Sequence, residues 1–198
     1  MPSFTRAELE SYRGARLPDL VGDDVRLVFV GINPGLRTAA TQIHFGNPGN
    51  RFRPALVEAG LLEPPVDGRP GMTKDDLATL VARHVGITNL VPFATARADE
   101  LTREQLLAGR DRLERFVARH RPRVVAMLGI TAYRSAFGRP RATPGRQPEA
   151  LGEAALWVVP NPSGLNAHES VASLGAAYAE PARAAGIEPS PRPGGGGA

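Results

Sequence analysis

Two apolar segments of this sequence end in turns that carry an asparagine. Residues 28–31 run into the turn Ile-Asn-Pro-Gly at 32–35, and residues 156–159 run into Pro-Asn-Pro-Ser-Gly-Leu at 160–165. Buried strands of an open α/β sheet end in this way when they present a polar side chain at the carboxyl edge of the sheet. A carboxamide both donates and accepts hydrogen bonds, so it can orient a water molecule and hold a small planar ligand. The sequence therefore predicts one cleft built from both strand ends.

The motifs of several common enzyme classes are absent from the sequence. It has no Gly-x-x-x-x-Gly-Lys-Ser/Thr phosphate loop, no Gly-x-Gly-x-x-Gly after the first strand and no Gly-x-Ser-x-Gly. The absence of cysteine excludes disulfides, thiolate catalysis, cysteine-ligated zinc and iron–sulfur clusters. The four histidines, His44, His84, His120 and His168, do not have the spacing of metal ligands. We therefore expect neither a metal nor a cofactor.

Strands and helices are expected to alternate along most of the chain. The predicted strands are residues 25–31, 86–91, 123–128 and 156–159, and the predicted helices are residues 5–13, 51–59, 73–84, 102–120, 130–137 and 169–185. This alternation is typical of an α/β fold, a three-layer α/β/α sandwich with a central, mainly parallel sheet. Capping-box patterns open the first and fourth of these helices. We expect a single domain at 1–186, followed by a disordered Pro/Gly-rich tail at 187–198.

Charge is distributed unevenly in a chain of otherwise ordinary composition. The 198 residues carry a net charge of +4, and residues 103–146 contain 11 arginines against 3 acidic residues. A basic face attracts polyanions such as nucleic acid. Lys74 is the only lysine, however, and a GC-rich genome alone would produce such a composition, so both interpretations remain open. No apolar stretch is long enough for a membrane span and the N-terminus lacks a signal-peptide core, which predicts a cytoplasmic protein.

Four motifs together resemble one enzyme family. They are Gly-Ile-Asn-Pro-Gly at 31–35, Gly-Asn-Pro-Gly-Asn-Arg-Phe at 46–52, Thr-Asn-Leu-Val at 88–91 and Asn-Pro-Ser-Gly-Leu at 161–165. Their order and spacing are similar to those of the mismatch-specific uracil/thymine DNA glycosylases, a branch of the uracil-DNA glycosylase superfamily. The resemblance implies base flipping from double-stranded DNA that carries G:U or G:T mismatches, followed by hydrolysis of the N-glycosidic bond. It also implies a monomeric enzyme without a cofactor.

The resemblance assigns roles to residues around the expected cleft. Asn33 would orient the attacking water through its amide oxygen, and Thr95 lies where some relatives use a hydroxyl to help hold that water. Phe45 matches the aromatic residue that stacks on the flipped base. Asn89 matches the residue that contacts the pyrimidine edge, and the backbone at Ile32 and Phe45 would add further contacts to the base.

By the same resemblance, the second strand end is a wedge loop that contacts DNA. Its residues are Asn161, Pro162, Ser163, Gly164, Leu165 and Asn166. Leu165 would enter the base stack, while Pro162 and Gly164 would let the backbone approach the widowed guanine. Relatives follow this segment with a small polar residue and an arginine, where this chain has Asn-Ala-His at 166–168. The missing arginine leaves the strength of the plug and the mismatch preference open.

Two further assignments concern single side chains near the pocket. His44, next to Phe45, is a candidate proton donor to the leaving base, because histidine titrates near neutral pH. Thr38 is a candidate for the residue that crowds the methyl group of thymine.

Two other functions remain as alternatives. One is a catalytically silent module that binds mismatches or lesions in DNA, and the other is a hydrolase of small nucleosides. If the protein is a glycosylase, we expect it to be monofunctional, because strand-cutting relatives need an amine and Lys74 is predicted to lie on a surface helix.

Overall fold

The computed structural model describes residues 3–65, 68, 71–164 and 169–190. Within these residues the elements follow one another in the order α1 (Arg6–Glu10), β1 (Leu27–Gly31), α2 (Leu36–Thr41), α3 (Phe52–Glu58), α4 (Lys74–Ala82), β2 (Val85–Asn89), the 3-10 helix η1 (Ala98–Glu100), α5 (Arg103–His120), β3 (Val124–Leu128), α6 (Ile130–Phe137), β4 (Gly145–Leu151), β5 (Ala154–Val159) and α7 (Val171–Ala184). No helix in this part of the chain is long and apolar enough to cross a membrane.

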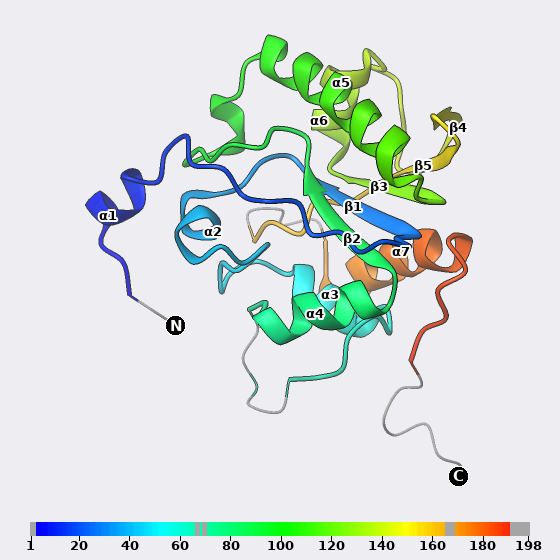
Figure 1. The fold of residues 1–198 in the computed structure, drawn as a ribbon, viewed down its shortest axis with the longest axis horizontal. Helices are drawn as coiled ribbons and strands as arrows, with labels where there is room; N and C mark the ends of the chain where they lie inside the picture. Colours follow the sequence, from blue (N-terminus) through cyan, green and yellow to red (C-terminus); the bar gives the residue numbers. More distant parts are fainter. Residues whose placement is uncertain (1–2, 66–67, 69–70, 165–168, 191–198) are drawn as a thin grey trace.

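A mostly parallel sheet forms the centre of the molecule. Its described strands lie in the order β2-β1-β3-β5-β4, and every neighbouring pair is parallel except β4 and β5. Because β2, β1, β3 and β5 run in the same direction, their carboxyl ends meet at one edge of the sheet (Figure 1). The α/β sandwich expected from the sequence is confirmed.

Helices cover both faces of this sheet. The alternating side chains of β1 separate the two cores: Phe29 packs with Phe52 of α3 and Tyr178 of α7, whereas Val28 packs on the opposite face with Leu113 of α5. Strands that are buried on both faces read as continuous apolar runs, which is why the sequence revealed β1 and β3 so clearly. The two helical layers cover the faces of the sheet, and loops surround its carboxyl edge.

Three short elements were not anticipated from the sequence. Helix α2 and the 3-10 helix η1 lie between expected elements, and β4 precedes the strand expected at 156–159. β4 contains Pro148 and several polar residues, and it pairs on one side only with an irregular register between Arg146 and Ala150. Proline is tolerated at such an edge because no further strand needs its missing N–H.

The folded part of the chain continues beyond the expected boundary at residue 186. Ile187 is only 5% exposed and belongs to the core beneath α7. The backbone N–H of Ser190 donates to the carbonyl of Gly60 (2.8 Å), and Arg83 contacts Glu188 O and Ser190 Oγ. The segment 187–190 is therefore packed rather than disordered. The rest of the expected tail, 191–198, lies outside the described residues.

Candidate active site

A cleft of ≈ 380 Å³ opens at the carboxyl edge of the sheet. It collects side chains and backbone from the ends of β1, β2 and β5, from α2 and from the loops that follow them. Among its lining residues are most of those expected from the sequence: Ile32, Asn33, Thr38, His44, Phe45, Asn89, Thr95, Asn161 and Ser163. Gly164 lines an adjoining groove of ≈ 570 Å³, and Pro162 is buried beside it. Leu165 and Asn166 lie outside the described residues.

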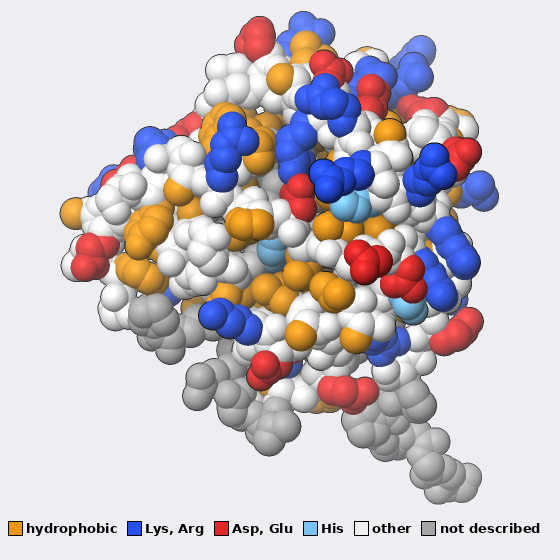
Figure 2. Space-filling view, viewed as in Figure 1, with side chains coloured by type: hydrophobic (Ala, Val, Ile, Leu, Met, Phe, Trp, Pro, Cys, Tyr) orange, Lys and Arg blue, Asp and Glu red, His pale blue; other side chains and the backbone are white. Residues whose placement is uncertain are grey.

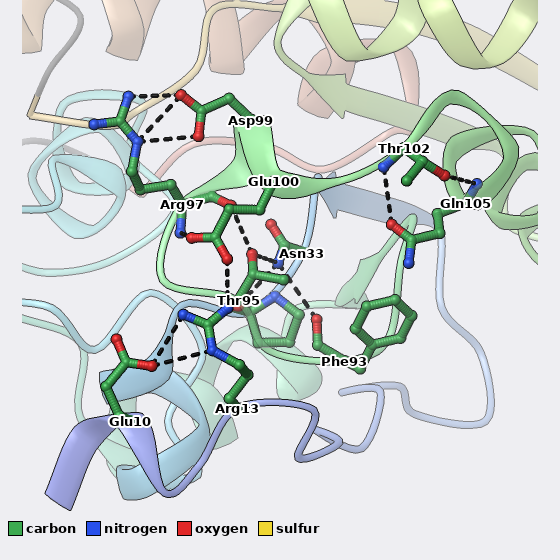
Figure 3. Close-up of polar contacts among 11 residues, drawn as sticks. Glu10, Arg13, Asn33, Phe93, Thr95, Arg97, Asp99, Glu100, Thr102 and Gln105 are labelled. Carbon is green, nitrogen blue, oxygen red and sulfur yellow. Dashed lines mark hydrogen bonds and ion pairs between the residues drawn. The ribbon is translucent and has the colours of Figure 1, made fainter. Parts of the chain in front are cut away.

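The amide of Asn33 is held in one orientation by oxygen atoms of the protein. Its Nδ2 donates to Thr95 Oγ1 (2.7 Å), to Pro34 O (3.2 Å) and to Phe93 O (3.3 Å), as Figure 3 shows. Because these three partners accept hydrogen bonds, the nitrogen must face them and Oδ1 must face away. Pro34 fixes the turn in which Asn33 lies, directly after β1. Asn33 therefore presents a hydrogen-bond acceptor on its remaining side.

Thr95 forms a hydrogen bond with Asn33, and its expected contact with a water stays a prediction. Its hydroxyl donates to Arg97 O (2.7 Å), so the same oxygen is available to accept the hydrogen bond from Asn33 Nδ2. Arg97 in turn pairs with Asp99 at the rim of the cleft (2.6 Å between Arg97 Nη2 and Asp99 Oδ2; Figure 3). The single hydrogen of the Thr95 hydroxyl is thus already used in the bond to Arg97 O. We assign the hydroxyl oxygen to the positioning of the Asn33 amide.

Phe45 forms an aromatic wall of the cleft. Its ring stacks on Phe52 with centroids 4.0 Å apart and an interplanar angle of 30°. Phe52 covers one face of the ring, and the ring also lines the cleft. The backbone of Phe45 has a φ of 54°, a left-handed conformation that a large side chain rarely adopts. Such backbone strain persists where surrounding structure enforces it, and it is concentrated at functional sites.

Asn89 ends β2 beside Gly31, its partner in the parallel register. Asn89 is only 6% exposed, and its Oδ1 would lie 2.6 Å from a Cβ placed on Gly31. The absence of a side chain at Gly31 therefore creates the space that the amide of Asn89 occupies. Thr38, on α2, is also buried and lines the same cleft, but its contact with a thymine methyl stays a prediction.

His44 is buried with its Nε2 3.0 Å from the carbonyl oxygen of Pro18. A carbonyl only accepts hydrogen bonds, so in the neutral ring Nε2 carries the hydrogen and Nδ1 does not. Burial also lowers the pKa of His44 below its ordinary value, which keeps the ring neutral. This geometry argues against the expected donation from His44 to a leaving base. The contact with Pro18 instead anchors the residue that precedes Phe45.

The burial of His44 should make the protein less stable in mild acid. The unfolded chain binds a proton at His44 near the ordinary pKa of 6.5, and the folded protein does so only at lower pH. The free energy of unfolding should therefore fall as the pH drops from about 7.5 to about 5.5. Urea denaturation at both pH values measures this fall, which should be smaller in His44→Gln. An equal fall in the variant and the wild type would contradict the assignment.

Arg51 holds the turn that follows β5. From the sequence alone, this residue is predicted only as the start of a helix. Arg51 donates from Nη2 to Ser163 O (2.8 Å) and from Nη1 to Glu169 O, and its backbone N–H donates to Pro162 O (2.9 Å). The side chain of Asn161 closes the same turn by accepting from Ser163 N (2.9 Å). Arg51 thus contacts the chain on both sides of residues 165–168. Its place in the motif at 46–52 was the available signal.

The arginine-rich segment at 103–146 lies away from the cleft. Most of it forms α5, α6 and the start of β4, which cover one face or edge of the sheet. Figure 2 shows its blue side chains among red ones over that layer. The described residues that line the cleft include two cations, Arg37 and Arg97. No group of three or more potential metal-ligating side chains occurs among the described residues.

Comparison with known proteins agrees with this architecture. The sequence model of the uracil DNA glycosylase superfamily matches residues 18–182, most of the chain. Among solved structures, the chain is similar to the NMR structure of a candidate uracil DNA glycosylase from Methanosarcina acetivorans, with a TM-score of 0.56 and 16% identity. That match covers 84% of this chain and 97% of the other. At this identity the structural likeness establishes the fold, and the family match establishes the relationship.

Proposed function

The chain belongs to the uracil DNA glycosylase superfamily, and we propose that it removes uracil, and more slowly thymine, mispaired with guanine in double-stranded DNA. The observation that carries this proposal is the fixed amide of Asn33. Its nitrogen is bound to three protein oxygens, so Oδ1 remains available to accept a hydrogen bond from a water molecule in the cleft. A water held in this way can attack the sugar C1′ of a nucleotide that has left the duplex.

The chemistry of the cleft favours departure of the base before water attacks. None of the described residues that line the cleft is an aspartate, a glutamate or a lysine. Without a strong base, the rate depends on how readily the base leaves as an anion, so uracil should leave faster than thymine. Without an amine, no Schiff base forms with the sugar, and the product is an intact strand with an abasic site.

Recognition of the base is assigned to Phe45 and Asn89. A ring that is already backed by Phe52 offers a rigid stacking surface, and stacking on an aromatic side chain is worth about 1–3 kcal/mol per base. The amide of Asn89 has both a donor and an acceptor, which suits the alternating polar edge of uracil. The absence of a side chain at Gly31 lets both groups approach the end of β1.

One set of duplexes tests the proposal. Oligonucleotides that carry G:U, G:T, A:U or single-stranded uracil are incubated with the protein and cleaved with alkali, with Asn33→Ala as the control. We expect cleavage in the order G:U, then G:T, and no strand cutting before alkali is added. If A:U is processed as fast as G:U, the mismatch preference is wrong. If the wild type releases no base from any substrate, the protein binds DNA without catalysis or acts on another substrate.

Substitution of Arg51 should impair duplex recognition more than base chemistry. In Arg51→Lys, one ammonium replaces a planar fork that reaches both Ser163 O and Glu169 O, so the turn after β5 loses part of its support. We expect the KM for a G:U duplex to rise by about tenfold, with a smaller change on single-stranded uracil. Steady-state kinetics on both substrates measures the difference.

Arg83→Lys is the matched control for this substitution. Arg83 also donates to a backbone carbonyl and to a second oxygen, those of Glu188 and Ser190, but these lie in the segment 187–190 and not in the turn after β5. Its substitution should lower stability without a selective effect on duplex KM. Equal losses on duplex and single-stranded substrates in Arg51→Lys would show that Arg51 has no special role in the response to duplex DNA.

A further inference from the structure

An N-terminal strap at residues 16–20 lies along the outer edge of β2 (Figure 1). Leu20 and Ile87 exchange two backbone hydrogen bonds of 2.8 Å, which extends the sheet by one antiparallel bridge. The strap also supplies the Pro18 carbonyl that binds His44. The strap therefore contacts His44, which precedes the candidate base-binding residue Phe45, and the strand β2, which ends at the candidate base-binding residue Asn89.

Asp19 of the strap is the centre of a compact polar cluster. Both of its carboxylate oxygens accept hydrogen bonds from Arg112 Nη2 (2.7 and 2.5 Å), and Oδ1 also accepts from the hydroxyl of Thr88 (2.5 Å). Arg112 Nη1 donates to Thr88 Oγ1 (3.1 Å) and to the carbonyl oxygen of Asn89 (2.8 Å). The side chains of Asp19 and Arg112 are each 24% exposed, and Thr88 is fully buried.

This cluster fixes the peptide from which Asn89 projects. Successive side chains of a strand point to opposite faces, so Thr88 points to the cluster while Asn89 points to Gly31 and the cleft. β2 is the last strand on its side of the described sheet. The guanidinium of Arg112 supplies the hydrogen bond to the Asn89 carbonyl that a neighbouring strand would otherwise supply. With both Thr88 and that carbonyl bound, the last peptide of β2 has little freedom to rotate.

We propose that the Asp19–Arg112 pair is the positioning device for Asn89, and that it sets how the pyrimidine edge is recognised. The inference rests on the proposed function for the role of Asn89, but the positioning itself follows from the contacts alone. The pair is partly removed from water, so loss of one partner leaves the other without compensation and releases the strand end. Neither residue lines the cleft, so both would act on the base through the backbone of β2.

A double-mutant cycle with Asn89→Ala separates positioning from general stability. In the otherwise unchanged protein, Arg112→Gln should lower kcat/KM for uracil release about tenfold to a hundredfold. In the Asn89→Ala background the same substitution should have almost no further effect, since no amide remains to be positioned. Arg112→Lys should restore activity only in part, because an ammonium cannot serve the two sides of the cluster as a fork does. Equal losses in both backgrounds would overturn the proposal.

Two additional variants guard against a failure to fold. Thr88→Val keeps the ion pair and the side-chain shape but removes the hydroxyl that joins Asp19 and Arg112, so it should show a smaller loss with the same dependence on Asn89. Arg110→Gln lies on the same helix and breaks the surface pair with Glu114 (2.9 Å); it should leave kcat/KM unchanged. A loss in Thr88→Val that persists without Asn89 would contradict the proposal.

A spectroscopic readout makes the test independent of catalysis. The side-chain NH₂ resonances of Asn89, assigned in ¹⁵N-labelled free protein by their absence in Asn89→Ala, should shift in Arg112→Gln and remain in place in Arg110→Gln. If the wild type releases no uracil but these resonances shift, the proposed function fails and the positioning stands. If uracil is released and the resonances do not respond to Arg112, the positioning fails alone.

Discussion

Asn33→Ala should lower the single-turnover rate of uracil release by at least about a hundredfold. The substitution removes the acceptor that orients water, while the stacking wall at Phe45 and the turn after β5 stay in place. DNA binding should therefore change little, which separates a lost chemical step from lost recognition. Rapid quench on a G:U duplex gives the rate, and fluorescence anisotropy on the same duplex gives the Kd. A rate within a few-fold of the wild type would remove Asn33 from the mechanism.

Thr95 supplies a matched pair of variants for this result. Thr95→Val removes the oxygen that accepts from Asn33 Nδ2 at 2.7 Å and allows the amide to rotate. The rate should fall by about fivefold to tenfold, as expected for one neutral hydrogen bond. Thr95→Ser keeps the hydroxyl and should retain most of the activity. If Thr95→Val keeps the activity and Thr95→Ser loses it, the methyl group of Thr95 matters and its hydrogen bond does not.

The fold was predictable where hydrophobic periodicity was strong. β1 and β3 are continuous apolar runs because helices cover both of their faces, and α5 opens with the capping box of Thr102 and Gln105 that the sequence indicated. β4 was not predicted, because an edge strand with Pro148 and a polar outer side lacks a strong hydrophobic periodicity. Its existence depends on pairing with β5, a contact that the local sequence of Gly145–Leu151 does not encode.

The site was predictable as a collection of residues but not as a set of hydrogen bonds. Motifs placed Asn33 and Asn89 at strand ends, and parallel strands bring such ends together. The direction in which each polar hydrogen points is decided by partners far along the chain. The Pro18 carbonyl, 26 positions away, determines which ring nitrogen of neutral His44 carries the hydrogen. Arg51 reaches Ser163 across 112 positions. No local sequence pattern contains these contacts. They nevertheless decide which hydrogen bonds the side chains of His44 and Arg51 can make.

Gly31→Ala should abolish most uracil release by filling the space that the amide of Asn89 occupies. A Cβ at this position would lie 2.6 Å from Asn89 Oδ1 and 3.4 Å from Phe45 Cζ. The first distance is too short for any real contact, so Asn89 or the strand must move. We expect kcat/KM for a G:U duplex to fall by about a hundredfold, with overpacking at the end of β1 costing about 1–3 kcal/mol of stability. Uracil-release kinetics and urea denaturation measure the two effects separately.

Gly35→Ala is the matched control, since the same methyl group is added at the other end of the same motif. No atom lies within 4 Å of a Cβ built on Gly35, and its φ of −77° is accessible to alanine. This variant should retain activity within about threefold of the wild type. Similar losses in both variants would mean that the motif needs glycine for backbone reasons, and space beside Asn89 would not be the cause.

The cause can be isolated further by removing the amide that the methyl group displaces. In an Asn89→Ala background, a methyl group on Gly31 no longer meets Oδ1 and keeps only the ordinary contact with the edge of Phe45. If Gly31 matters because it makes room for Asn89, adding Gly31→Ala to Asn89→Ala should cost far less activity than adding it to the wild type. A full additional loss would place the effect on Phe45 or on the base itself. The two results thus distinguish which group at the end of β1, the amide of Asn89 or the ring of Phe45, requires the space beside Gly31.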